Sequence, residues 1–384
     1  MIKKFVSFLI SVSVILFSGI TTRAETSVPT VSAKSSILVD RLSGEVLFEK
    51  SADTRLSMAS TTKILTCVIA LESGKLNEIV EVDSAWVRVE GTSLGLAGGD
   101  RISLYDLCVG LMLTSGNDAA NVIAFFLSGS LESFAVRMNI KAKAIGMSAS
   151  SFVTPSGLDA QEHYTTARDM ALLASYAMCK DEFRRIVSLR SADLTMLNSG
   201  AKRTVYTHNK LLTTYEGCTG IKTGYTKKSG RCLVSSVKRG SAELICVTFS
   251  APDDWNDHKK LFDYGFSLYN EYDVTVTDDH RLRIVGGMND YISVRCAKTV
   301  LNLTEAGCGL LKSELLLPVF EYSPVSIGDT VGKVRYTVNG NVIAESSVVA
   351  VESAPFLKRS YIEKKKNYGD CLAALVTGRN LGGT

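Results

Sequence analysis

The sequence is poor in the residues that build metal centres and redox motifs. It has four histidines, scattered at His163, His208, His258 and His280, and it contains neither a Cys-x-x-Cys nor a His-x-x-x-His motif. Structural metal sites need clustered ligands at short spacings. We therefore predict no metal site and no cofactor.

A large excess of charge of one sign is also absent. The 43 lysines and arginines against 39 aspartates and glutamates give a formal net charge of +4. Lys3, Lys4 and Arg23 supply three of these charges, so the rest of the chain carries about +1 (4 − 3). No basic run is interleaved with aromatic residues, as the electrostatic footprint of a nucleic-acid-binding protein requires. We predict no nucleic acid partner.

The nine cysteines do not follow the pattern of a disulfide framework. Their number is odd, their spacings are irregular, and Cys67, Cys108 and Cys246 lie inside apolar runs. Small disulfide-stabilised secreted domains carry an even number of cysteines at regular spacings. The sequence therefore favours buried or free thiols over bridges.

One long uncharged apolar run stands near the N-terminus, from Phe5 to about Ile20. Two lysines precede it, and Thr22-Arg23-Ala24 follows with small residues at the −3 and −1 positions of a cleavage site. A run of about 16 residues is short for a membrane span. We therefore predict that residues 1–24 are a secretory signal peptide and that the chain is exported.

The length of 384 residues and the hydrophobic content of 46% allow two domains. Strand patterns flank a glycine-bearing turn at 37–48, helical periodicity dominates 100–190, strand patterns return over 203–249, and a helical pattern closes at 259–270. Strands, then helices, then strands again indicate an α+β domain over 25–271 whose sheet partners lie far apart in sequence.

The pattern of apolar residues changes beyond residue 272. Short alternating runs follow, and Asn339-Gly340 is a strong two-residue hairpin signal. Together they predict an all-β domain over 272–357. The tail over 358–384 combines three consecutive lysines with a short apolar patch at 371–376. Such a basic and apolar segment is a weak signature of contact with a membrane surface.

Ser60 and Lys63 stand three residues apart where an apolar run begins and continues to Gly74. If this run is a helix, both side chains share one face near its N-terminus, where the helix dipole favours a developing negative charge. Burial disfavours the charged form of a lysine. A serine beside a neutral amine is a candidate nucleophile for acyl transfer.

Two further motifs complete a candidate site for acyl transfer on a peptide. Ser115-Gly116-Asn117 is predicted on a tight link between helices, where Ser115 can relay a proton and Asn117 can fix Lys63 and the substrate amide. Lys222-Thr223-Gly224 ends a strand pattern. Its lysine and threonine offer charge and a hydroxyl to a carboxylate, and its glycine lets a substrate backbone lie against the strand.

The order Ser-x-x-Lys, Ser-x-Asn, Lys-Thr-Gly resembles that of the penicillin-binding proteins and class A β-lactamases. The longer blocks at 57–63, 113–120, 157–166, 220–226 and 263–266 resemble the low-molecular-weight penicillin-binding proteins, the serine-type D-alanyl-D-alanine carboxypeptidases of peptidase family S11. The resemblance covers nearly the whole chain after the signal peptide, including the β-rich region.

The resemblance implies an antiparallel sheet flanked by helices, a helical subdomain and a small β domain. It implies that Ser60 forms an acyl-enzyme with the penultimate D-alanine of a peptidoglycan stem peptide, with Lys63 as the general base. Ser115 and Asn117 would move protons and orient the peptide, while Lys222 and Thr223 would bind its terminal carboxylate. The backbone N–H groups of Ser60 and Tyr225 would form the oxyanion hole, and β-lactam antibiotics would acylate Ser60.

The predicted signal peptide places the chain outside the cytoplasm, in the cell wall or on the outer face of the cytoplasmic membrane. The resemblance leaves three alternatives for its function open. A D,D-endopeptidase that cuts cross-links would use the same residues. A β-lactamase would need a Glu-x-x-x-Asn loop, which the 155–200 stretch lacks. A cell-wall-binding protein without activity would not need the intact motifs. Arg231 is a candidate second cation for the carboxylate by proximity alone.

Overall fold

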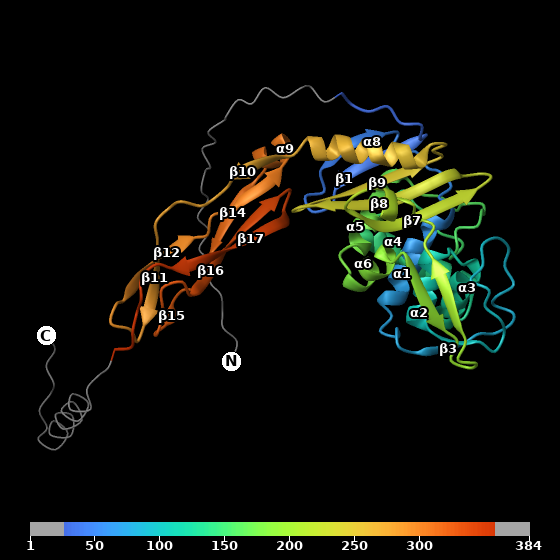
Figure 1. Ribbon diagram of the computed structural model, residues 1–384, viewed down its shortest axis with the longest axis horizontal. Helices are drawn as coiled ribbons and strands as arrows, with labels where there is room; N and C mark the ends of the chain where they lie inside the picture. The colour runs from blue at the N-terminus through green and yellow to red at the C-terminus, as the bar shows by residue number, and fades with distance from the viewer. Residues whose placement is uncertain (1–26, 358–384) are drawn as a thin grey trace, which may run out of the picture.

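The structure is a computed structural model that describes residues 27–357 (Figure 1). The predicted signal peptide (1–24) and tail (358–384) lie outside the described residues. In chain order the elements are β1 (Ser35–Asp40), β2 (Val46–Lys50), the 3₁₀ helix η1 (Ala59–Thr62), α1 (Lys63–Leu71), β3 (Ile79–Glu81), β4 (Arg101–Ser103), α2 (Leu104–Leu113), α3 (Asn117–Ser128), α4 (Leu131–Ile145), α5 (Ala167–Ala177), α6 (Asp181–Ser188), β5 (Ser191–Thr195), β6 (Lys202–Tyr206), α7 (Leu211–Thr214), β7 (Cys218–Thr226), β8 (Gly230–Arg239), β9 (Ala242–Phe249), α8 (Asp254–Ser267), β10 (Asn270–Asp273), β11 (His280–Val285), β12 (Tyr291–Cys296), β13 (Val300–Leu303), α9 (Glu305–Gly309), β14 (Lys312–Leu316), β15 (Glu321–Tyr322), β16 (Thr330–Val338) and β17 (Asn341–Ala350).

A five-stranded antiparallel sheet of order β2-β1-β9-β8-β7 forms the centre of the N-terminal domain. The predicted hairpin is β1 and β2, and the strands predicted in the second half of the domain include β7, β8 and β9. The sheet therefore joins the two ends of this domain in space. Strand β7 lies at one edge, which leaves one of its sides open to other partners.

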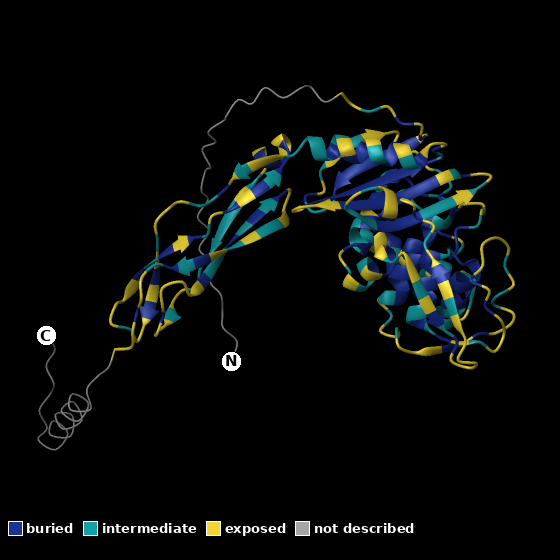
Figure 2. Ribbon diagram, in the orientation of Figure 1, coloured by how far each residue is buried: buried dark blue, intermediate teal, exposed yellow. Residues whose placement is uncertain are grey.

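Apolar residues on both faces of the sheet explain its position between two helical layers. On β1, Leu38 packs with Leu261 and Phe262 of α8, whereas Ile37 and Val39 face the larger helical core. Successive side chains of a strand point to opposite faces, so one strand supplies both layers. Figure 2 shows β8 and β9 buried between α8 and the other helices. This arrangement confirms the predicted α+β class.

The helices of the N-terminal domain follow the predicted periodicity. Helix α4 lies within the stretch 100–190 where helical periodicity is predicted, and α5 begins where Thr166 accepts a hydrogen bond from the Asp169 backbone N–H at 3.0 Å. The Thr-x-x-Asp spacing predicts a reciprocal capping box. The Asp169 carboxylate instead accepts hydrogen bonds from Ala149 and Ser150, because tertiary contacts provide donors for it.

The C-terminal domain is built on a six-stranded sheet of order β14-β16-β17-β12-β11-β15, with β10 and β13 as a separate pair. Asn339 and Gly340 link β16 to β17, both with positive φ (52° and 79°), as a type I′ turn requires. The predicted hairpin at this position is confirmed. The domain boundary that we expected between 271 and 272 falls inside β10.

Some predicted elements differ from the structure. The run at 274–276 is predicted as a strand, but the polar residues Asn270–Asp273 form β10 because β13 pairs with them. Strand β5 and its pairing with β6 escaped the sequence analysis, because its residues show no clear alternation. The short elements β3, β4, β13, β14, β15 and α9 were also not predicted.

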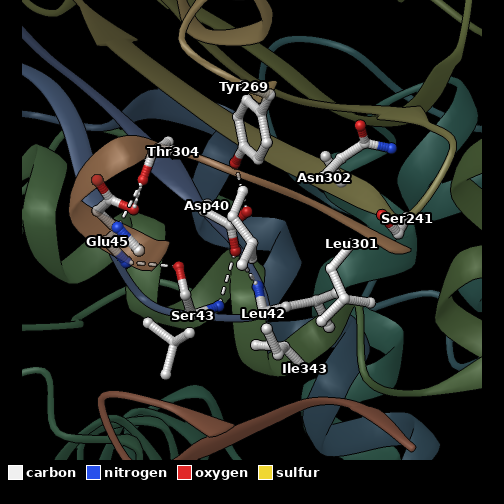
Figure 3. A pocket seen from close by; sticks show the side chains of 14 residues that line it. Asp40, Leu42, Ser43, Glu45, Ser241, Tyr269, Leu301, Asn302, Thr304 and Ile343 are labelled. Carbon is white, nitrogen blue, oxygen red and sulfur yellow. Dashed lines mark hydrogen bonds between the residues drawn. The ribbon is translucent and has the colours of Figure 1, made fainter. Parts of the chain in front are cut away.

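The two domains contact each other at the turn between β1 and β2 (Figure 3). Thr304 donates a hydrogen bond to the Glu45 carboxylate at 2.7 Å, and Asn341 donates one to the Ser43 carbonyl at 3.1 Å. Burial raises the pKa of Glu45. From this contact the C-terminal domain extends away from the N-terminal domain along its own long axis, as Figure 1 shows.

The eight cysteines among the described residues are free thiols, and six of them are buried. The favoured interpretation of buried or free thiols is therefore confirmed for these positions. Within residues 27–357, no single helix is long and apolar enough to cross a bilayer. Helices α3 and α4 meet that criterion only as a pair bent by 85°.

Candidate active site

Ser60 lies in the 3₁₀ helix η1 immediately before α1, so the predicted helix start is correct to within one turn. The Lys63 amine lies 2.8 Å from the Ser60 hydroxyl oxygen. The residue before the serine, Ala59, has φ of +47°, a conformation that non-glycine residues rarely adopt. Such geometry persists where the surroundings fix it and is concentrated at functional sites.

Lys63 is fully buried, and its pKa lies well below the ordinary value. Burial is the main cause, and the nearby positive charge of Lys222 adds to it, while Asp118 opposes it. Because the interior solvates an ammonium group poorly, the neutral amine is favoured. The predicted burial of this lysine is therefore present in the fold.

The partners of the Lys63 amine define where its lone pair points. It donates hydrogen bonds to the Asn117 side-chain carbonyl at 2.8 Å and to the Ser156 backbone carbonyl at 2.6 Å. A neutral amine has two N–H donors, and carbonyl oxygens can only accept. Both donors are thus occupied, which leaves the lone pair to accept the Ser60 hydroxyl proton.

Asn117 connects Lys63 to the loop that borders the site. Its side-chain N–H₂ donates to the Glu90 carbonyl at 2.7 Å, and its backbone N–H donates to the Thr92 carbonyl at 2.7 Å. The neighbouring Asp118 carboxylate accepts hydrogen bonds from the backbone N–H groups of Leu94, Gly95 and Leu96. The start of α3 therefore holds this loop and orients Lys63 at the same time.

Ser115 lies on the link between α2 and α3, as predicted, with φ of +63°. It is 6% exposed, and together with Ser60 it lines an open cleft of about 520 Å³. The structure therefore brings the first two motifs to one cavity. Ser115 therefore borders the space in which a substrate would meet Ser60.

The third motif lies on the edge strand β7, next to η1. A Cβ on Gly224 would stand 3.0 Å from the Ser60 backbone nitrogen, so glycine permits the close approach of the two segments. Lys222 is 1% exposed and donates to the Thr223 carbonyl at 3.1 Å. Burial lowers the pKa of Lys222 to about 7. Thr223, Gly224 and Tyr225 line the same cleft as Ser60.

The predicted oxyanion hole uses the backbone N–H groups of Ser60 and Tyr225. The contact between β7 and η1 brings the backbone of Gly224, the neighbour of Tyr225, to the nitrogen of Ser60. The side chain of Tyr225 is 67% exposed and lines the same cleft as Ser60. The role of these two donors stays a prediction.

Arg231, the candidate second cation for the substrate carboxylate, lies on β8 at the wall of the cleft. Its guanidinium is 3.5 Å from the carboxylate of Asp254, the first residue of α8. Asp254 is nearly buried, whereas the Arg231 side chain is 53% exposed and free to meet a ligand. The cleft therefore has a second cation near Thr223, held by an acidic neighbour.

Several cleft residues were not predicted as part of the site. They are Thr92, His208, Asp254 and Trp255. Burial lowers the pKa of His208, and the charge of Lys222 lowers it further. These residues come from separate loops and from the start of α8, and no motif marks them in the sequence.

A second group behind the site holds η1 in place. His163 accepts a hydrogen bond from the Val153 N–H on Nδ1 at 2.9 Å, so in its neutral form Nε2 carries the proton and donates to Thr62 at 2.9 Å. Thr62 in turn donates to the Ala59 carbonyl. Gly157 packs against the same carbonyl, because a Cβ there would stand 1.9 Å from it. His163 and Gly157 belong to a motif block that the sequence analysis identified without assigning this role.

Comparison with known proteins agrees with this geometry. The profile of the Peptidase_S11 family, D-alanyl-D-alanine carboxypeptidase, matches residues 22–253. The chain is 31% identical over 346 residues to D-alanyl-D-alanine carboxypeptidase DacF of Bacillus subtilis, which covers 85% of this chain and 89% of that protein. It is 30% identical over 365 residues to DacC of Escherichia coli, with 88% of each chain covered.

Solved structures show the same two-domain fold. The crystal structure of penicillin binding protein 5 from Haemophilus influenzae superposes with a TM-score of 0.61 at 26% identity, and the match covers 86% of this chain and all of that one. The family match spans most of the N-terminal domain and carries all three motifs. This chain therefore belongs to peptidase family S11, the D-alanyl-D-alanine carboxypeptidases among the low-molecular-weight penicillin-binding proteins.

Proposed function

We propose that this chain is an active, penicillin-sensitive serine D-alanyl-D-alanine carboxypeptidase that removes the terminal D-alanine from peptidoglycan stem pentapeptides. The observation that carries the proposal is the buried Lys63 amine, whose two N–H donors are occupied and whose lone pair meets the Ser60 hydroxyl. Family membership and the names of the similar proteins support the same substrate class.

In the acylation step, Lys63 accepts the proton of Ser60 while the serine oxygen attacks the carbonyl carbon of the penultimate D-alanine. The negative charge that develops on the carbonyl oxygen is stabilised by the N–H groups of Ser60 and Tyr225. Ser115 then passes the proton to the nitrogen of the terminal D-alanine, and the C–N bond breaks. In the second step water attacks the ester, and the serine regains its proton.

The cleft offers separate partners for the peptide backbone and for its terminal carboxylate. The open side of β7 near Gly224 can pair with an extended peptide, since an edge strand exposes backbone donors and acceptors. Thr223 and Arg231 lie at the adjacent wall and supply a hydroxyl and a positive charge, and the buried Lys222 amine lies behind them at the Thr223 carbonyl. A carboxylate at this point places the preceding peptide bond over Ser60.

Two assays on one preparation test the proposal. Mass spectrometry of the intact protein after benzylpenicillin should show one adduct that Ser60→Ala abolishes, whereas Ser73→Ala, a serine at the end of α1, should retain it. A peptide ending in D-Ala-D-Ala should release D-alanine with the same dependence. Labelling without release would favour a binding protein, rapid turnover of penicillin a β-lactamase, and cleavage of cross-linked dimers alone an endopeptidase.

We further infer that the chain acts outside the cytoplasm, in the cell wall or at the outer face of the cytoplasmic membrane. The support is the signal-peptide pattern over 1–24. N-terminal sequencing of the mature protein should begin near Glu25. A mature protein that begins at Met1 in the cytoplasm would contradict the inference.

A further inference from the structure

The far end of the C-terminal domain carries apolar side chains that the fold does not bury. Met288 is 67% exposed, Phe356 59% and Tyr322 57%. Exposed apolar residues that are scattered singly are ordinary, whereas a contiguous apolar patch marks an interaction site. Residues of this kind gather on three adjacent segments, which we call the tip patch: Val285, Met288, Phe320, Tyr322, Phe356 and Leu357.

Backbone pairing shows that these segments lie side by side. Val285 of β11 pairs in register with Tyr322 of β15, and the Phe320 and Tyr322 rings are in edge contact with centroids 5.3 Å apart. On the other side of β11, the Leu357 N–H donates to the Gly286 carbonyl at 3.0 Å. The tip patch is therefore one continuous surface rather than scattered exposed residues.

The tip patch marks the place where the described chain ends. Figure 1 shows β11 and β15 at the end of the C-terminal domain that points away from the N-terminal domain and its cleft. The sequence continues from Leu357 directly into Lys358-Arg359 and reaches three further lysines at 364–366. A surface at this end can meet a partner without blocking the candidate active site.

Charge at the tip decides between kinds of partner. Arg281 and Arg283 are exposed on β11, where Ile284 pairs in register with Glu321 and donates to the Asp290 carbonyl, so residues of both charges lie at the tip. The lysines and arginine that follow Leu357 make the end of the chain positive. Apolar and aromatic side chains beside positive charge fit the headgroup region of an anionic bilayer.

We propose that the tip patch inserts into the surface of an anionic lipid bilayer, so that the folded domain itself provides a second membrane contact beside the tail. Aromatic and methionine side chains enter the boundary between headgroups and acyl chains, while the basic residues bind anionic lipids. The long axis of the C-terminal domain then holds the cleft at a distance from the membrane. The vesicle experiments below need neither export nor catalysis, so their outcome is independent of the proposed activity.

Sedimentation with vesicles measures the contact on the full chain. Phosphatidylcholine vesicles that contain phosphatidylglycerol should bind the protein, and added salt should weaken binding. The double variant Met288→Asp/Phe356→Asp should bind about tenfold more weakly, because two apolar contacts are replaced by charge. The control Val136→Asp/Ile140→Asp changes two exposed residues of α4 and should bind normally. Circular dichroism should be the same for all.

The double variant Leu372→Asp/Leu375→Asp changes only the apolar segment of the tail. It separates the contribution of the tail to vesicle binding from that of the tip patch. If this variant loses all binding and the tip variant binds like the unchanged chain, the tail alone contacts lipid and the proposal is wrong. Partial loss in each variant supports two contacts.

A fluorescent probe tests insertion directly, even if the acidic variant misfolds. Both native tryptophans, Trp86 and Trp255, lie in the N-terminal domain. In Phe356→Trp, brominated lipids should quench the new tryptophan, whereas Val342→Trp, close to the domain joint, should stay unquenched. No quenching at 356 in vesicle-bound protein would overturn the proposal. A blue-shifted emission without vesicles would also overturn it, because a second copy or the tail would then cover the patch.

Discussion

Lys63 and Lys222 are two buried amines, and the positive charge of Lys222 makes the charged form of Lys63 less favourable. Desolvation is the largest cause of the low pKa of both. For Lys63 the consequence is a base that can accept the proton of Ser60. For Lys222 it is a cation whose charge depends on pH in the physiological range.

The pH dependence of substrate capture should report Lys222. Its pKa is about 7 in the free protein, so the ammonium form, which holds a carboxylate, is lost as the pH rises through that value. We expect kcat/KM to fall above about pH 7, while kcat falls less because a bound carboxylate raises the pKa of Lys222. A substrate amidated at its C-terminus should lack this fall. A kcat/KM that stays flat to pH 9 would contradict the expectation.

A second prediction concerns His163, which burial keeps neutral with a pKa of about 4 instead of 6.5. Between these values the unfolded chain binds a proton that the folded chain does not, so stability falls as the pH decreases through the window. The loss should be about 2 kcal/mol between pH 7 and pH 5. Urea unfolding at both values measures it.

His163→Gln serves as the comparison for that experiment. It should lower stability at neutral pH, because the contact with Thr62 changes, but its stability should depend less on pH by the same amount. His258 is also buried, and burial lowers its pKa to about 3, so part of the acid sensitivity will remain. An unchanged pH dependence in the variant would show that His163 does not contribute.

At the scale of elements, the site depends on how η1 is held between β7 and the segment around Gly157. Gly224 allows β7 to approach the Ser60 nitrogen, and Gly157 allows its own segment to approach the Ala59 carbonyl. A Cβ at Gly157 would collide with that carbonyl, and a Cβ at Gly224 would force its neighbours to shift by a few tenths of an ångström. The 3₁₀ helix that carries Ser60 is therefore positioned by contacts from both sides.

Substitution of Gly157 tests this positioning. Gly157→Ala should destabilise the fold by about 3 kcal/mol or more and slow acylation of Ser60, because its Cβ would collide with the Ala59 carbonyl. Gly129→Ala is the matched control: its φ is also positive, but nothing lies within 4 Å of its Cβ. It should cost about 1 kcal/mol. Equal effects in both variants would mean that conformation, rather than contact with η1, decides the outcome.

At the scale of the whole molecule, the relative placement of the domains depends on a few polar contacts at the β1–β2 turn. Thr304 contributes twice: it donates to the Glu45 carboxylate and accepts the Gly307 N–H at the start of α9. The joint encloses a cavity of about 30 Å³, which polar residues such as Glu45 and Thr304 line together with apolar residues such as Leu42 and Ile343. Small polar interfaces between domains permit relative motion.

Thr304→Val should loosen this joint. We expect about 1–2 kcal/mol of lost stability in the C-terminal domain and a broader distance distribution in small-angle X-ray scattering, because the link to Glu45 and the helix cap are both removed. Acylation by penicillin should not change, since the cleft lies elsewhere. Thr330→Val, an exposed threonine of β16, is the control. A scattering curve identical to that of the unchanged protein would exclude the role.

Part of the site could not be predicted because no sequence motif contains its residues. The Ser156 carbonyl that orients Lys63 lies 93 residues away in sequence, and Asp254 and Trp255 reach the cleft only because α8 begins at its wall. Strand β5 was missed for a related reason, since its partner β6 rather than its own pattern determines its conformation. Prediction by periodicity succeeds where one face is buried, as in α4 and the β16–β17 hairpin.

The candidate site of three motifs, the α+β order and the turn at Asn339-Gly340 could all be predicted before the chain is folded. They depend on spacing, periodicity and backbone preference, which are local properties of the chain. The tertiary structure alone decided that Lys63 is fully buried with both N–H donors occupied, that β7 is an edge strand against η1, and that apolar residues meet at the tip. Each of these depends on contacts between segments far apart in sequence, and burial and hydrogen-bond partners exist only once those segments have packed.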